Sequence, residues 1–271
     1  MQRAALEVVL LAPIAGVLGA QIVLRHLAFF THGVGAAAFP GLVIAGPAGI
    51  PPALAALGVG GGFAALLERL GRRTGLAYDA ATALLLVGAL AIGIVLASDV
   101  FESGSGVDQL LFGSLLAIGT TELLFTAATL AAVLIAAAVF RRTWIASGFD
   151  GLGGGTLGLR TALADGILIA AVALAAIASL DAVGALLVSA MLVVPAATAR
   201  LFAPSVVALE LGGGALALTE GLAGLLIAAQ RAVPPGPAIA VLGGIVFVIG
   251  LTARELTAWG SGRLRPSRAG A

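Results

Sequence analysis

The residues of this chain that could do chemistry are few, and their types favour cation binding over catalysis. His26 and His32 are the only histidines among 271 residues, and there is no cysteine. The sequence has no His-Glu-x-x-His motif and no Ser/His/Asp constellation that would support hydrolysis. Glu220 lies inside the apolar run ALALTEGLAGLLIA. Imidazole and carboxylate groups can ligate cations, so His32 and Glu220 are the candidate ligands.

Two glutamates stand in or beside this apolar run, and their spacing separates their roles. An ionised side chain at the centre of a membrane helix costs at least about 2.5–3.5 kcal/mol, so Glu220 must face protein or water, in a pathway or in a packing contact. Glu210 lies about 15 Å away along a helix and about 80° around it. The two carboxylates therefore cannot share one ion unless the helix bends. Glu210 is nearer the expected inner end, where it meets Arg200 or solvent.

The composition places these residues in a membrane protein. Hydrophobic residues make up 61% of the chain and charged residues 10%, and the mean hydropathy is +1.16. Too little polar surface is available to coat a soluble domain of this length. The net charge of +1 gives no reason to expect nucleic-acid binding. The N-terminal apolar run is too long for a simple signal peptide, so we expect it to remain as the first membrane span.

Apolar runs of membrane-crossing length predict an all-α fold, a polytopic transmembrane helix bundle of about nine spans. The segment QLLFGSLLAI, residues 109–118, is apolar but too short to cross, so we expect a short re-entrant or interfacial helix there. Residues 1–258 are expected to form the transmembrane domain and residues 259–271 a cytoplasmic C-terminal tail. The expected spans lie near residues 5–24, 33–49, 51–68, 79–97, 121–140, 162–180, 182–201, 205–228 and 237–256.

The arginines are distributed unequally between the two sides of these spans. One side carries Arg25, Arg69, Arg72, Arg73, Arg141, Arg142, Arg200, Arg254, Arg263, Arg265 and Arg268. The other side carries Asp99, Glu102, Asp108 and Asp181, with Arg3 and Arg231. Because basic residues in short loops favour the cytoplasmic side, we predict an outer N-terminus and a cytoplasmic C-terminus.

The run from Asp181 to Pro204 is expected to be the central span. It carries no charge between Asp181 and Arg200, which is long enough to cross a membrane. Pro195 has no N–H to donate to the carbonyl of Met191, so we expect a kink there. Small residues on both sides of the kink predict close contacts with other helices. Before the kink these are Gly184, Ala185 and Ser189. Asp181 either caps the N-terminus of this helix or attracts an incoming cation.

Several segments of the chain resemble one family. The run VGALLVSAMLVVPAATARL is similar to a segment of the membrane permease subunits of ATP-binding-cassette importers for zinc, manganese and iron. The first two spans and the entry to the last span match the same family in the same order. The matching positions are Gly16, Gly19, Arg25, Pro40, Gly41, Pro234, Pro235 and Gly236. The resemblance implies a divalent metal as the transported substrate and no permanently bound cofactor.

The resemblance also implies partners and a location. It implies a multi-pass protein of a bacterial plasma membrane that pairs with a second permease copy, beside a cytoplasmic ATPase subunit and an extracytoplasmic metal-binding protein. The chain contains no lysine and therefore no Gly-x-x-x-x-Gly-Lys-Ser/Thr loop, so ATP hydrolysis must take place on another polypeptide. The translocation pathway is expected to pass His32, Glu220, Asp181 and Pro195.

The family's intramembrane ligand motif is altered in this chain. The family reads Gly-Asp-x-x-x-His-Ala-x-x-Pro-Gly where this chain reads THGVGAAAFPG, so Thr31 and His32 stand at the Gly-Asp positions and Ala36 at the histidine. Ala36 cannot bind a metal. His32 lies on the same helical face as Ala36, one turn away, and we predict that it lines the pathway. The alternatives are an interfacial position for His32 or a substrate other than a metal.

A coupling segment is expected in the longest inner loop, residues 141–165. The family has a helix there that inserts into the ATPase, and its Phe-Asp start and Leu-Gly end correspond to Phe149, Asp150, Leu157 and Gly158. Here glycines fill the middle, and each disfavours a helix by about 1 kcal/mol. A flexible linker is the alternative.

A different class of function also fits the acidic residues. A proton-coupled secondary transporter of a small solute or ion would carry its proton on Glu210, Glu220 or Asp165. Transport by the chain alone under a pH gradient would favour this class, whereas dependence on an added ATPase would favour the importer.

Overall fold

The computed structural model describes residues 1–74, 78–100, 113, 118–149, 161–180, 184, 188–231 and 233–260. Every regular element in these ranges is a helix, which confirms the all-α prediction. The helices are α1 (Gln2–Leu24), α2 (Ala28–Ala37), α3 (Phe39–Ala48), α4 (Pro52–Thr74), α5 (Tyr78–Val95), the π-helical turn η1 (Leu96–Val100), α7 (Thr120–Phe149), α8 (Thr161–Ala178), α10 (Val188–Leu192), α11 (Val194–Arg200), α12 (Val206–Arg231) and α13 (Pro235–Gly260).

Each of the predicted spans has a helical counterpart. Among the described residues, six segments are long and apolar enough to cross a membrane: Gln2–Leu24, Ala28–Ala48, Ala80–Ser98, Thr120–Gly148, Val206–Arg231 and Pro235–Thr257. The other three predicted spans correspond to shorter apolar helices: Pro52–Leu67, Leu163–Ala178 and Val188–Arg200. The count of nine is thus approximate, and the polytopic helix bundle is confirmed.

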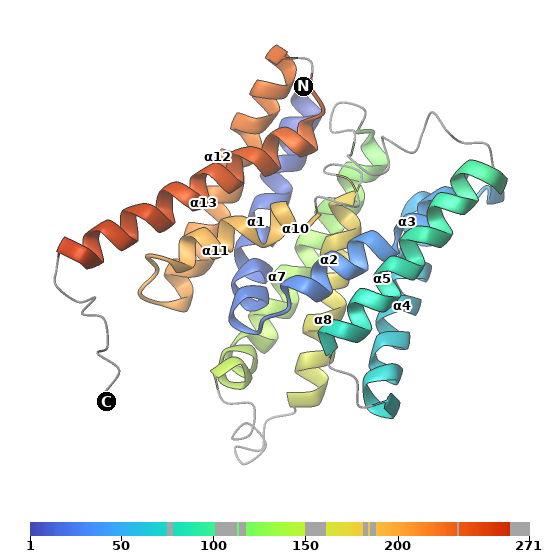
Figure 1. The fold of residues 1–271 in the computed structure, drawn as a ribbon, viewed down its shortest axis with the longest axis horizontal. Helices are drawn as coiled ribbons and strands as arrows, with labels where there is room; N and C mark the ends of the chain where they lie inside the picture. The colour runs from blue at the N-terminus through green and yellow to red at the C-terminus, as the bar shows by residue number, and fades with distance from the viewer. Residues whose placement is uncertain are drawn as a thin grey trace, which may run out of the picture.

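The helices form two groups that meet along α7, α8 and α10 (Figure 1). In the first group, α1 lies against α7, α11 and α12, and α13 packs on α11 and α12. In the second group, α2 and α3 pack on α4 and α5. The short helix α10 contacts both α1 and α2, so it lies where the two groups meet.

Glycines allow the helix backbones of the first group to approach closely. A Cβ atom at Gly16 of α1 would lie 2.5 Å from the carbonyl oxygen of Glu210 and 3.0 Å from Cα of Gly214, both on α12. A Cβ atom at Gly19 would lie 2.5 Å from the carbonyl oxygen of Leu192. Apolar bulk gains little over lipid tails, so small residues at such contacts supply the packing that holds membrane helices together.

Two ion pairs hold one end of the bundle. Arg25 Nη1 lies 2.6 Å from Asp165 Oδ1, which joins the end of α1 to α8. Arg141 Nη2 lies 2.6 Å from Glu210 Oε2, which joins α7 to α12. Glu210 was expected to meet Arg200 or solvent, but its partner is Arg141. The reason is that α7 continues as a helix past residue 140 and brings Arg141 to α12.

The kink predicted beside Pro195 is confirmed. Helix α10 ends at Leu192 and α11 begins at Val194, with Pro195 in the first turn of α11. Only Val193 separates the two helices, and i→i−4 hydrogen bonds from Val193 N to the carbonyl oxygen of Ser189 and from Ala197 N to that of Val193 continue across it. One sequence-based expectation needs correction. The inner loop begins later than expected, since α7 runs to Phe149, well beyond residue 140.

Candidate functional site

His32 and Ser189 lie side by side between α2 and α10. The hydroxyl oxygen of Ser189 is 3.4 Å from Nδ1 of His32, across 157 positions of sequence. Both residues are half-buried. Imidazole nitrogens bind transition metals, and the partner of one ring nitrogen orients the other. This contact places His32 against the segment that the sequence singled out as central.

Tight packing fixes α2 around His32. A Cβ atom at Gly33 would lie 2.8 Å from Cγ2 of Thr82, and one at Gly35 would lie 3.2 Å from Cβ of Val188. Ala36, one turn from His32, is fully buried. The position of the family histidine is therefore an enclosed apolar contact in this chain, and His32 remains the candidate ligand on α2.

The junction between α10 and α11 leaves one backbone oxygen without its helical donor. Pro195 has no N–H, so the carbonyl of Met191 loses its partner one turn ahead. Val193, at the junction, has a φ of −101° and a ψ of −46°. In membrane transporters, irregular backbone at such depth is tolerated where it is buried in protein or lines a cavity, and its carbonyls coordinate cations. The carbonyl of Met191 therefore lacks the donor that residue 195 would otherwise supply, in the same segment as Ser189.

Glu220 is buried on α12 and faces α13. Its side chain is 4% exposed, and its Oε1 atom has no hydrogen-bond partner within the described residues. Its Oε2 atom would lie 3.0 Å from a Cβ atom added at Gly243. Glu220 therefore faces protein and not lipid, as the cost of a charge in lipid requires.

The structure does not bring the two predicted metal ligands into one cluster. His32 contacts α10, whereas Glu220 packs against α13. Within the described ranges, no three side chains of His, Cys, Asp or Glu come together that could hold a metal ion. Asp181 lies outside the described residues, so its two predicted roles stay open.

Replacing Glu220 by glutamine tests whether this carboxyl group serves transport. Glutamine keeps the volume, so we expect a folded protein of unchanged thermal stability. We expect metal uptake by the assembled transporter to fall at least about tenfold, because a buried intramembrane carboxyl group without a partner is costly to keep for packing alone. Uptake at the native rate would assign Glu220 to helix packing.

A second polar cluster ties α1 to the ends of α7 and α8. Besides its ion pair with Asp165, Arg25 donates through Nη2 to the carbonyl oxygen of Trp144 at 2.8 Å and to Ser147 Oγ at 2.7 Å. Trp144 Nε1 donates to the carbonyl oxygen of Ala164 at 2.8 Å. We call Arg25, Trp144, Ser147 and Asp165 the Arg25 cluster. It connects the helices that flank the predicted coupling segment to the turn just before α2.

The predicted coupling residues lie at the limit of the described chain. Phe149 is the last residue of α7, and its side chain is not described. Asp150, Leu157 and Gly158 lie outside the described residues. The Arg25 cluster was missed from the sequence, where Arg25 served only to predict orientation and as one matching position of the family resemblance. The spacing of Trp144 and Ser147, which places both on one helical face, was the signal that could have pointed to it.

Comparison with known proteins gives one consistent picture. A family model described as "ABC 3 transport family" matches residues 1–254. The manganese transport system membrane protein MntC of Halalkalibacterium halodurans is 29% identical over 249 residues, covering 92% of this chain and 85% of the relative. The chelated iron transport system membrane protein YfeD of Yersinia pestis is 27% identical over 252 residues, covering 93% and 84%.

A solved structure shows the same fold. PsaBC from Streptococcus pneumoniae in complex with Fab superposes with a TM-score of 0.84, at 26% identity, over 92% of this chain and 90% of the other.

Proposed function

The chain belongs to the ABC 3 transport family, and we propose that it is the membrane-spanning permease subunit of an ATP-binding-cassette importer that moves manganese or iron into the cell. The observation that carries the proposal is the full-length similarity to the manganese and chelated-iron permeases, together with the shared fold. The His32–Ser189 contact supplies the intramembrane metal contact for this function. Zinc, the third metal of the predicted family, appears in none of the relatives named above.

The acidic residues argue against a proton-coupled carrier. Such a mechanism needs carboxyl groups that change protonation during transport. Asp165 and Glu210 are each paired with an arginine at 2.6 Å. Two of the three carboxyl groups that this alternative needs are therefore engaged in ion pairs in this structure. Of the three residues that this alternative requires, only Glu220 has no such partner within the described residues.

The proposed importer needs further subunits. This chain has no Walker loop, so we propose that a separate cytoplasmic ATPase subunit drives it and that an extracytoplasmic metal-binding protein delivers the metal. We further propose that a second permease copy completes the pathway as a homodimer. The residues from Phe149 to Gly158 would face the ATPase, and the Arg25 cluster would carry its movement to α1 and α2.

The same proposal sets the orientation. The ends of α1 and α7 and the starts of α8 and α12 meet through the two ion pairs, at the arginine-rich end of the bundle. Arginine-rich ends favour the cytoplasm, so the N-terminus would lie outside and the C-terminus inside a bacterial plasma membrane. A reporter fused to the C-terminus should be active only inside the cell, and activity only outside would overturn this orientation.

Metal uptake by the assembled importer tests the function and the role of His32. With manganese, iron and zinc offered separately, we expect the native chain to support uptake of manganese or iron. We expect His32→Ala to reduce uptake at least about tenfold, because a pathway ligand is lost. His26→Asn is the matched control, since His26 has a φ of 58° that asparagine tolerates and lies in a turn.

The results of this uptake experiment test the metal assignment and the role of His32 separately. Uptake of no metal by the native chain would contradict the metal assignment. Equal uptake by the native and His32→Ala chains would contradict only the role of His32.

A further inference from the structure

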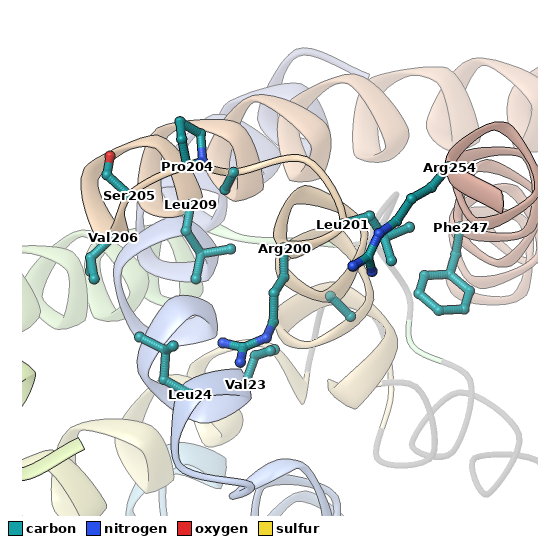
Figure 2. Close-up of a pocket in the computed structure, with 12 residues that line it drawn as sticks. Val23, Leu24, Arg200, Leu201, Pro204, Ser205, Val206, Leu209, Phe247 and Arg254 are labelled. Atoms are coloured by element: carbon teal, nitrogen blue, oxygen red, sulfur yellow. The ribbon is translucent and has the colours of Figure 1, made fainter. Parts of the chain in front are cut away.

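A cavity of about 580 Å³ opens at the arginine-rich end of the bundle. The end of α1, the connection between α11 and α12, and the later part of α13 surround it (Figure 2). Its apolar walls come from Val23, Leu24, Leu201, Leu209 and Phe247. We call it the Arg200 pocket.

Two exposed arginines line this pocket. Arg200 is the last residue of α11, and Arg254 lies two turns after Phe247 on the same face of α13. In Figure 2, the side chain of Arg200 extends toward Val23, and that of Arg254 extends toward Leu201. The pocket therefore presents two guanidinium groups beside an apolar wall.

These arginines differ from the other two discussed at this end. Arg25 and Arg141 are satisfied by Asp165 and Glu210. Within the residues that the structure describes, Arg200 and Arg254 make no ion pair and no side-chain hydrogen bond. Two carboxylates adjoin the pocket lining in sequence. Glu210, next to Leu209, is held by Arg141. Glu255, next to Arg254, is exposed and makes no ion pair with either arginine within the described residues. The positive charge of the pocket is thus left for a ligand from outside the described chain.

We propose that the Arg200 pocket binds the phosphate headgroup of an anionic membrane lipid. A guanidinium group matches phosphate oxygens through two parallel hydrogen bonds. The apolar residues beside the arginines suit hydrocarbon chains, which a free anion lacks. Basic pockets between transmembrane helices on the cytoplasmic side have the charge and position to bind anionic headgroups.

The place of the pocket favours a lipid over a protein partner. The apolar helix α1 ends at Leu24 and α12 begins at Val206, so the pocket lies at the level where apolar spans give way to charged residues. Lipid phosphates lie at this level of a bilayer. A carboxylate of a soluble subunit would need the arginines but not the apolar wall.

Native mass spectrometry of the purified full-length chain tests the site without depending on the transported substrate. The chain is titrated with phosphatidylglycerol, with phosphatidylcholine and with inorganic phosphate. We expect retained phosphatidylglycerol in preference to phosphatidylcholine. We expect its affinity to fall roughly twenty-five-fold in the Arg200→Gln/Arg254→Gln double variant, about fivefold per arginine. Arg142→Gln is the matched control, because Arg142 is exposed on α7 and does not line the pocket.

Three outcomes would overturn the proposal. Equal phosphatidylglycerol binding by the native chain and the double variant would show that these arginines do not form the site. Displacement of the lipid by inorganic phosphate at equal concentration would assign the pocket to free phosphate. Unchanged lipid binding with loss of a co-purifying ATPase subunit would assign the arginines to a subunit interface. Each of these outcomes counts only if the double variant is folded, which unchanged elution in size-exclusion chromatography would show.

Discussion

Gly16→Leu is expected to prevent the accumulation of folded protein. A Cβ atom at this position would lie 2.5 Å from the carbonyl oxygen of Glu210 and 3.0 Å from the backbone of Gly214. Both neighbours are backbone atoms of α12, which cannot rotate away as a side chain can. Overpacking costs typically about 1–3 kcal/mol even where side chains can yield, so α1 and α12 should separate. The measurement is the amount of monodisperse protein recovered in detergent.

The control for this prediction is Gly88→Leu. Gly88 lies in α5 with nothing within 4 Å of an added Cβ atom. Both variants place the same side chain in a membrane helix, so only the contact with α12 differs. Equal recovery of the two variants would show that α1 and α12 do not pack as described.

Arg25→Ala is expected to destabilise the protein and to stop uptake. Arg25 donates to Asp165, to Ser147 and to the carbonyl oxygen of Trp144, and its side chain is 13% exposed. Removing one partner of a buried pair costs about 3–5 kcal/mol. We expect the lower end of this range, because the side chain of Asp165 is 38% exposed and water can satisfy part of it. The measurements are thermal unfolding in detergent and metal uptake.

Two further variants make this prediction specific. Arg25→Lys keeps the charge but not the planar fork, so it should recover only part of the stability. Arg142→Ala removes an exposed arginine at the same end of the bundle and should change little. Full recovery of stability in Arg25→Lys would mean that charge alone matters. Native stability and uptake in Arg25→Ala would contradict the role of the Arg25 cluster.

The membrane spans could be predicted from the sequence because length and hydropathy decide them locally. Each predicted run corresponds to one helix or to two consecutive helices in its described part: residues 33–49 correspond to α2 and α3, and residues 182–201 to α10 and α11. Helix α2 begins at Ala28, earlier than the expected residue 33. The kink beside Pro195 was predictable, since a missing N–H is a property of one residue.

The site could be predicted only as a set of residues, not as contacts. His32 was found from its rarity and from the altered family motif. Its neighbour Ser189 was identified only as a small residue, because the contact joins residues 157 positions apart. The same limit applies to the ion-pair partner of Glu210. Its position along the membrane suggested Arg200, but the packing of α7 brings Arg141 to it.

The most direct test of the importer assignment is metal transport in liposomes that contain this chain with or without its ATPase subunit. We predict uptake of manganese or iron only when the ATPase and ATP are both present, and no uptake by the isolated chain under a pH gradient. Uptake by the isolated chain that follows the pH gradient and ignores ATP would contradict the account and favour a proton-coupled carrier.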